Sequence, residues 1–315
     1  MKKFTSFLLS ALLVLSLAAC GSNGDARSTA SESSAGSTTS SEAESSAAAT
    51  EEATATPEPT EEPSAQPPLE ETVLLDEGGI KVTATGLTDY GLGGAPDLEL
   101  HVENNTDGDI MVQTSEYAAV NGCMVRGIAS IQASAGDSAD DTVMFLDDEF
   151  EKAGIETVSD IKLAVRAIDA DWNEICASDF VTVKTSAYGT VETPAVDGDV
   201  LYDKDGVRVI LLGTEEDEDF DFYFPTYVKL YIENNSEQDI TVKTLDFKAN
   251  GAVTQCSLNA ELLAGTRQFT ELRLDVDSCT QNGITELKDL SFYFSVCDLM
   301  TWNEITKSDT VTLEF

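Results

Sequence analysis

Two copies of one sequence pattern constrain what this chain can fold into. The tetrapeptide Trp-Asn-Glu-Ile occurs at residues 172–175 and again at residues 302–305, and these copies contain both tryptophans of the 315-residue chain. Flanking segments repeat in the same order, since LELHVENNTDGDIMVQT at 98–114 matches VKLYIENNSEQDITVKT at 228–244. A nearly constant offset of this kind indicates an internal duplication, so we expect one domain of roughly 115 residues to occur twice.

Each copy is rich in short segments in which apolar and polar residues alternate. Examples are IKVTATGL, LELHVENN and IKLAVRAID in the first copy, and VRVILLGT, VKLYIENN and LSFYFSVCD in the second. Alternation with a period of two predicts half-buried strands, and turn residues such as Gly79 and Gly206 separate them. The sequence therefore predicts an all-β fold made of two tandem antiparallel β-sandwiches, Ig-like in the broad sense.

One short helix is expected in each copy. In the first copy, LDDEFEKAG places Asp147 at the N-cap, acidic residues in the first turn and Gly154 at the C-cap. In the second copy, VDSCTQNG carries a weaker form of the same signal and ends at Gly283. The expected helix content is therefore low.

The first residues, 1–19, are expected to form a lipoprotein signal peptide. Lys2 and Lys3 precede an apolar stretch at residues 7–17 that is too short to cross a bilayer as a stable helix. The following Leu-Ala-Ala-Cys-Gly sequence resembles the lipobox of bacterial lipoproteins. That resemblance implies cleavage before Cys20 and lipidation of Cys20 with a diacylglyceryl group carrying fatty acids such as palmitate. The alternative is an ordinary secretory signal with an incidental cysteine.

Residues 20–71 have the composition of a disordered acidic tether. Ser, Thr, Ala, Glu and Pro dominate, and the stretch 28–68 contains no aromatic and no branched aliphatic residue. Such a segment cannot bury enough apolar surface to offset its chain entropy. Cleavage before Cys20 would leave 16 basic and 58 acidic residues, a net charge of −42. That charge argues against nucleic acid as a partner and against basic-patch contact with anionic lipids, so we expect the lipid to anchor the protein at the extracytoplasmic face of the cell membrane.

The folded part is expected to comprise domain 1 at residues 72–187, a linker at 188–197 and domain 2 at 198–315. In both copies ENN, DI and NG are followed by AG and GI, and then by Trp-x-x-Ile ahead of Ser-Asp. This pattern resembles uncharacterised Ig-like domains found in surface lipoproteins of gut Firmicutes. The resemblance covers nearly all of the expected folded part, implies a β-sandwich and a surface location, and implies no established activity.

The two tryptophans allow two interpretations. We expect Trp172 and Trp302 to be buried at one end of each sandwich, because burial of an aromatic ring stabilises a domain substantially. Ile175 and Ile305 would then point into the core. The alternative is an exposed aromatic platform for a sugar or a peptide, which would make the two tryptophans a binding surface.

An acidic stretch, TEEDEDFDFYFP at residues 214–225, is the sharpest local anomaly of the sequence. Acidic side chains at this density repel one another, so a bound calcium ion would stabilise them. Its weak candidate ligands are Glu215, Glu216, Asp217, Asp219 and Asp221. The alternative, a solvated loop that leads into a strand, needs no ligand and is the interpretation that we favour. The turn DADWNE at 169–174 resembles a calcium loop only superficially, because it lacks the central glycine and the distal glutamate. We therefore expect no metal and no other cofactor.

The remaining sequence offers little for catalysis, and we expect the protein not to be an enzyme. The single histidine, His101, shares an exposed strand face with Glu99 and Glu103 by alternation, and no glycine-rich phosphate loop opens a helix. The cysteine spacing matches no metal site, and a disulfide within the second half stays an open alternative. After Cys20, the cysteines are Cys123, Cys176, Cys256, Cys279 and Cys297.

These features favour a lipid-anchored cell-surface protein with a binding or structural role at the envelope. Its partner would be an envelope component or another protein, with the membrane contacted through the lipid on Cys20. The alternative is an accessory solute-binding or calcium-dependent sensor lipoprotein. No motif in the sequence names the ligand.

Overall fold

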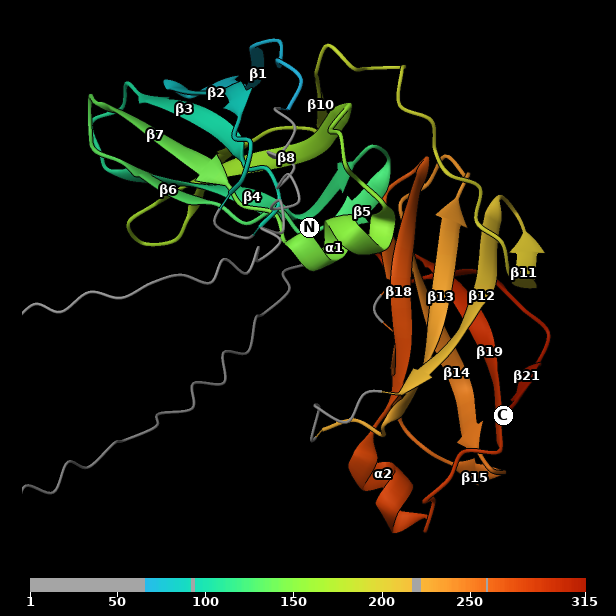
Figure 1. Cartoon of the computed structure of the whole chain (residues 1–315). Coiled ribbons are helices and arrows are strands. Elements are labelled where there is room, and N and C mark those ends of the chain that lie inside the picture. The colour runs from blue at the N-terminus through green and yellow to red at the C-terminus, as the bar shows by residue number, and fades with distance from the viewer. Residues whose placement is uncertain (1–65, 92–93, 217–221, 259) are drawn as a thin grey trace, which may run out of the picture. The chain divides into compact units, whose positions relative to one another are not determined.

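The computed structural model describes residues 66–315, apart from 92–93, 217–221 and 259. Most of the described residues lie in strands that pair antiparallel, and two short helices accompany them (Figure 1). The prediction of an all-β fold is confirmed. The predicted signal peptide, Cys20 and most of the predicted tether lie outside the described residues.

In the first half of the described chain, strands β1 to β10 form two antiparallel arrays. Their bounds are Thr72–Glu77 (β1), Ile80–Leu87 (β2), Leu98–Asn104 (β3), Ile110–Val120 (β4), Cys123–Val125 (β5), Ser130–Ala133 (β6), Ser138–Val143 (β7), Asp160–Asp169 (β8), Glu174–Ala177 (β9) and Val181–Lys184 (β10). One array has the order β1-β2-β3-β7, and the other has the order β10-β8-β4-β5, with β6 also paired to β4 and β9 to β8. The alternation in β3 buries Leu98, Leu100 and Val102 on one face, as the period of two predicts.

In the second half, strands β11 to β21 repeat this arrangement. Their bounds are Asp199–Lys204 (β11), Val207–Glu216 (β12), Thr226–Asn234 (β13), Ile240–Ala249 (β14), Ala252–Val253 (β15), Cys256–Leu258 (β16), Ala260–Leu262 (β17), Thr266–Leu274 (β18), Asp289–Asp298 (β19), Glu304–Lys307 (β20) and Val311–Glu314 (β21). One array has the order β18-β13-β12-β11, with β16 paired to β18. The other has the order β15-β14-β19-β20, with β17 paired to β14 and β21 to β19.

Strands β5 and β18 connect the two halves. They pair in parallel through one register pair, Cys123 with Arg267, which joins strands of both halves into one 11-stranded sheet. Beside this pair, the Arg267 backbone N–H donates to the Gly122 carbonyl oxygen at 2.9 Å. The two halves are therefore joined by backbone pairing as well as by the chain between β10 and β11.

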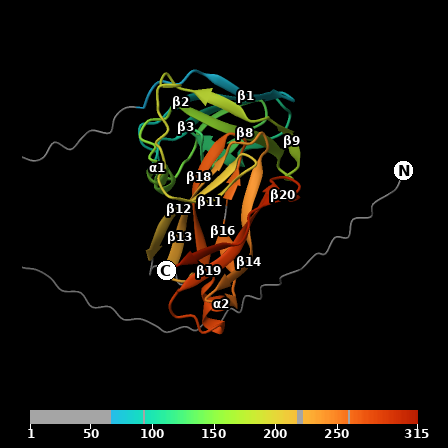
Figure 2. The ribbon, with the colours of Figure 1, turned by 90° about the vertical axis from the view of Figure 1, so that its right-hand side faces the viewer.

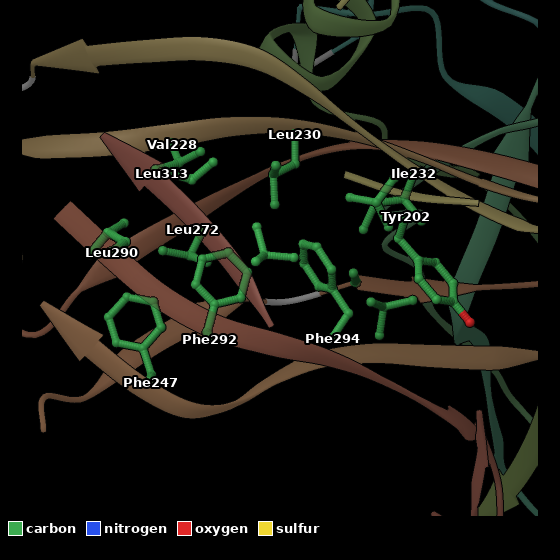
Figure 3. Packing of buried hydrophobic residues seen from close by; sticks show 14 of the residues in the cluster. Tyr202, Val228, Leu230, Ile232, Phe247, Leu272, Leu290, Phe292, Phe294 and Leu313 are labelled. Carbon is green, nitrogen blue, oxygen red and sulfur yellow. The ribbon is translucent and has the colours of Figure 1, made fainter. Parts of the chain in front are cut away.

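The buried apolar side chains form two clusters. One consists of residues from the first half alone, and the other consists of residues from the second half together with Ala119 and Met124 from the first. In the second cluster, Phe292 packs between Phe247 and Phe294, with ring centroids 5.6 Å and 5.2 Å away, and the aliphatic side chains of β13 face these rings (Figure 3). Full burial of each such side chain stabilises the fold by about 1.5–3 kcal/mol.

A buried asparagine ends the same strand in both halves. Asn104 ends β3, and its side-chain amide donates to the carbonyl oxygens of Gly108, Ala133 and Ser134 at 2.9–3.0 Å. Asn234 ends β13 and makes the same three bonds. Its acceptors are the carbonyl oxygens of Gln238, Leu262 and Leu263 at 2.8, 3.3 and 3.0 Å. The repeated Glu-Asn-Asn sequence thus performs one structural role twice, which supports the internal duplication.

Two helices lie where the sequence predicts them. Helix α1 spans Asp147–Ala153 and ends at Gly154, whose φ of 63° is left-handed as expected for a C-cap glycine. Its N-cap is Leu146 rather than the predicted Asp147, because Asp147 already has helical backbone. Helix α2, Val276–Gln281, lies at one end of the second half (Figure 2) and is capped by the Asp275 side chain, which accepts from Ser278 N at 2.7 Å.

The last residues of the predicted tether pair with the first half. The Glu70 N–H donates to the Lys184 carbonyl oxygen at 3.1 Å, and the Ser186 N–H donates to the Pro68 carbonyl oxygen at 2.9 Å. The Gln66 side chain accepts from the Val158 N–H at 3.1 Å. The described end of the predicted tether, from Gln66 onward, therefore forms hydrogen bonds with the first half that its composition does not reveal.

Candidate functional site

The first Trp-Asn-Glu-Ile turn joins β8 to β9 and is built around Asp169. The Trp172 N–H donates to the Asp169 carbonyl oxygen at 3.0 Å, and the Asp169 N–H donates to the Asn173 carbonyl oxygen at 2.9 Å. The Asp169 carboxylate accepts from the backbone N–H groups of Asp171 and Asn173 at 2.9 Å. Hydrogen bonds from the Asn173 side chain, followed by those backbone bonds, lower the pKa of Asp169. Asp169, the first residue of the turn that superficially resembles a calcium loop, thus holds this turn through hydrogen bonds.

The second turn joins β19 to β20 and has the same plan with one more residue. The Trp302 N–H donates to the Asp298 carbonyl oxygen at 2.9 Å, and the Asp298 N–H donates to the Asn303 carbonyl oxygen at 2.9 Å. The Asp298 carboxylate accepts from the Thr301 hydroxyl at 2.8 Å and the Thr301 N–H at 2.7 Å, and these bonds lower the pKa of Asp298. In both halves an aspartate therefore organises the turn that presents the tryptophan.

Both tryptophans lie on the surface. Trp172 is 70% exposed and Trp302 is 57% exposed. Ile175 and Ile305, the expected core residues, are 42% and 43% exposed. The prediction that the rings are buried at an end of each sandwich, with these isoleucines in the core, is therefore wrong. The physical reason is that each tryptophan lies in the turn of a hairpin, between β8 and β9 or between β19 and β20, where neighbouring strands cover the ring only in part.

The backbone at both tryptophans is left-handed, with φ of 67° at Trp172 and 60° at Trp302. This position after a tight turn ordinarily belongs to Gly or Asn, and another residue costs about 1–2 kcal/mol there. An exposed ring recovers little of that cost through burial. Stability therefore does not explain why a tryptophan occupies this position twice, and strained, exposed residues of this kind occur preferentially at functional sites.

A groove of about 270 Å³ lies beside Trp172. Trp172 and Met111 contribute apolar surface to its lining, and Asp109, Gln132 and Ser134 contribute polar groups. Asp109 is already engaged, because its carboxylate accepts from the Ala135 N–H at 3.0 Å. The side chains of Gln132 and Ser134 are exposed and form no hydrogen bond with any residue in the described part of the chain. These two neutral groups face the groove with their bonding capacity unused.

The surroundings of Trp302 differ from those of Trp172. The Lys243 ammonium lies 5.5 Å from the centroid of the Trp302 ring, within cation–π distance. Where β4 and β6 pair Met111 with Gln132 in the first half, β14 and β17 pair Thr241 with Glu261 in the second. The two tryptophans therefore differ in their neighbours, since Trp172 lines a groove and Trp302 has an ammonium over its ring.

The acidic stretch is only partly described. The Glu215 carboxylate accepts from Lys229 Nζ at 2.7 Å and from the Tyr227 hydroxyl at 2.6 Å. The hydrogen bond from Lys229 is the largest cause that lowers the pKa of Glu215. Asp217, Asp219 and Asp221 lie outside the described residues, and no group of three metal-binding side chains occurs within the described ranges. Glu215 is thus engaged by its own neighbours.

The other reactive side chains are dispersed. His101 Nδ1 lies 2.6 Å from Asp140 Oδ1 on the outer face of β3 and β7. The five described cysteines are free thiols, and burial raises the pKa of Cys123 to about 11. Among the described residues, no helix is long and apolar enough to cross a membrane.

A larger cleft of about 640 Å³ is lined by β5, α1, β12, β13 and β18. The sequence did not predict this cleft, because it forms only where β5 meets β18. Its charges pair with one another, as Arg126 does with Glu149 at 2.6 Å and Lys152 with Glu271 at 3.3 Å. These pairs engage much of the charge that lines the cleft, while Gln268 Oε1 is buried without a hydrogen-bond partner among the described residues.

Comparisons with known proteins leave the family open. No family model matches the sequence, and no curated protein matches it. Among solved structures, the chain is similar to a protein of unknown function from Porphyromonas gingivalis W83, with 13% identity, a TM-score of 0.19, and coverage of 76% of this chain and 100% of that one. It is also similar to red sea bream transglutaminase, with 11% identity and a TM-score of 0.21, over 78% of this chain and 31% of the enzyme.

Proposed function

We propose that this protein is a lipid-anchored cell-surface protein whose two tandem Ig-like sandwiches bind a component of the cell envelope. The contact surface is the exposed Trp-Asn-Glu-Ile turn, foremost that of the first half. The observation that carries this proposal is the strained, left-handed backbone at exposed Trp172 and Trp302, which the stability of the fold does not require.

Duplication supports the binding role. The repeated asparagine network at Asn104 and Asn234 and the repeated aspartate-centred turns are consistent with two copies of one domain on a single chain. Each copy thus presents an exposed tryptophan turn on the same chain, and the surroundings of the two turns differ. A binding protein needs no group of catalytic side chains. His101 pairs with Asp140 on an outer strand face and does not form part of such a group.

The proposal of a lipid anchor is based on the lipobox-like sequence that ends at Cys20. We expect a Cys20→Ala variant to leave the membrane fraction and to appear in the soluble fraction or the medium. Membrane association that persists unchanged in this variant would show that the lipid on Cys20 is not the anchor.

The binding role is tested by capture from an envelope extract with the full chain carrying Cys20→Ala. Glycine replaces tryptophan without strain at a left-handed position, so Trp172→Gly, Trp302→Gly and the double variant should all fold. We expect the double variant to lose the captured material. Capture that is indifferent to both tryptophans would contradict the proposed contact surface.

A further inference from the structure

We propose that the groove beside Trp172 binds a sugar ring of a neutral glycan, and that the Trp302 turn does not. This inference rests on the proposed function and names the chemistry of its ligand. It begins with the groove itself, since Trp172 lines it together with Met111, Gln132 and Ser134.

The shape of the groove suits one ring. Its volume of about 270 Å³ lies below the range of roughly 300–1,000 Å³ that encloses a drug-sized molecule. The indole of Trp172 supplies a flat, polarisable surface on which the apolar face of a pyranose can stack, while its backbone is held by the Asp169 hydrogen bonds. A rigid aromatic of this kind loses little conformational entropy on binding.

The polar groups of the groove favour a neutral ligand. The carboxylates of Asp109 and Asp169 accept amide hydrogen bonds, and their negative charge disfavours an anionic ligand. The Gln132 amide and the Ser134 hydroxyl both donate and accept, which matches the hydroxyl groups of a sugar. The net charge of the chain, −40, disfavours a polyanionic glycan.

The turn that carries Trp302 has different neighbours from the turn that carries Trp172. Lys243 lies over the Trp302 ring, where a stacked sugar would have to displace it. At the strand positions that correspond to Met111 and Gln132, the second half has Thr241, which is buried, and Glu261, which lines the larger cleft. The same tetrapeptide therefore presents a tryptophan beside a groove in one half and an exposed tryptophan with an ammonium near one face in the other.

The test uses the full chain with Cys20→Ala and three neutral oligosaccharides: cellohexaose, maltohexaose and the hexamer of N-acetylglucosamine. Binding is measured by isothermal titration calorimetry. We expect saturable binding of at least one of them, a loss of at least tenfold in affinity for Trp172→Gly, and a change below about twofold for Trp302→Gly. Gln132→Ala should weaken binding several-fold while leaving the unfolding midpoint unchanged.

Three results would overturn the inference. The first is that none of the three oligosaccharides binds at millimolar concentration. The second is that Trp172→Gly and Trp302→Gly lose oligosaccharide affinity equally. The third is that polylysine competes for capture from the envelope extract and the oligosaccharides do not. The last result would identify a basic polypeptide as the partner. Capture from the extract that depends on Trp172 while no oligosaccharide binds would reject the glycan and keep the proposed function, whereas capture independent of both tryptophans would reject the function itself.

Discussion

Trp172 and Trp302 occupy the same left-handed backbone position in two hairpin turns, with φ of 67° and 60°, and both are more than half exposed at 70% and 57%. Hydrogen bonds to an aspartate, Asp169 or Asp298, fix the backbone of each turn. The position of the tryptophan ring therefore does not depend on its packing. Stability and recognition can therefore be separated at this residue by mutation.

Replacement of Trp172 by glycine should not destabilise the protein. Relief of the left-handed conformation contributes about 1–2 kcal/mol, and the greater flexibility of glycine in the unfolded chain removes about 0.5–1 kcal/mol of that gain. We expect a midpoint of denaturant unfolding that is unchanged or slightly raised. A loss of about 3 kcal/mol or more, as for a buried aromatic, would contradict the exposed position.

Replacement of Asn104 by alanine should destabilise the protein by about 1–3 kcal/mol, because three carbonyl oxygens that accept from its buried amide lose their donor. Asn234→Ala should behave alike in the second half. Asn105→Ala is the matched control, since this exposed neighbour should change the free energy of unfolding by no more than about 0.5 kcal/mol. Equal effects of the two neighbours would show that the network does not stabilise the fold.

Acid should loosen the first turn. The folded-state pKa of Asp169 is lowered, so its contribution is fully present above the unfolded value of about 3.9 and is lost as the pH falls through the folded value. The amide signals of Asp171 and Asn173 in NMR spectra should report this titration with a midpoint below about 3.9. Asp169→Asn should abolish it. A midpoint at or above the ordinary value would contradict the hydrogen bonds that hold the turn.

The cysteines should behave as buried thiols. Four of the five described cysteines are buried and Cys256 is intermediate, so a thiol reagent at pH 8 should modify Cys256 first. Cys123 should react slowly, because burial raises its pKa to about 11 and leaves little thiolate. We expect the reagent to modify all five cysteines when the Cys20→Ala chain is unfolded without a reducing agent. If only three of the five thiols react, the other two form a disulfide.

Local patterns predicted much of this fold. Period-two alternation located β3 and β13, and the glycine at Gly154 located the end of α1, because strands and caps depend on neighbours in sequence. The pairing of Cys123 with Arg267 was not predicted, since one register pair between segments far apart leaves no periodic signal. The tight turns at Gly79 and Gly206 were predicted, and both have positive φ, 84° and 81°.

The candidate site was predicted only in part. The repeated tetrapeptide pointed to Trp172 and Trp302, yet burial depends on which strands reach the turn, and that is a property of the folded chain. The groove combines Asp109 and Met111 with Gln132 and Trp172, from three separate segments. No spacing in the sequence shows that these segments meet.

The exposure of the two tryptophans is the central observation, and intrinsic fluorescence measures it directly because Trp172 and Trp302 are the only tryptophans of the chain. The measurement is acrylamide quenching of the folded Cys20→Ala chain, compared with the same chain in denaturant. We predict an emission maximum typical of solvent-exposed indole and quenching close to that of the unfolded chain. A blue-shifted emission that resists acrylamide in the folded chain alone would contradict the account and restore the tryptophans to the core.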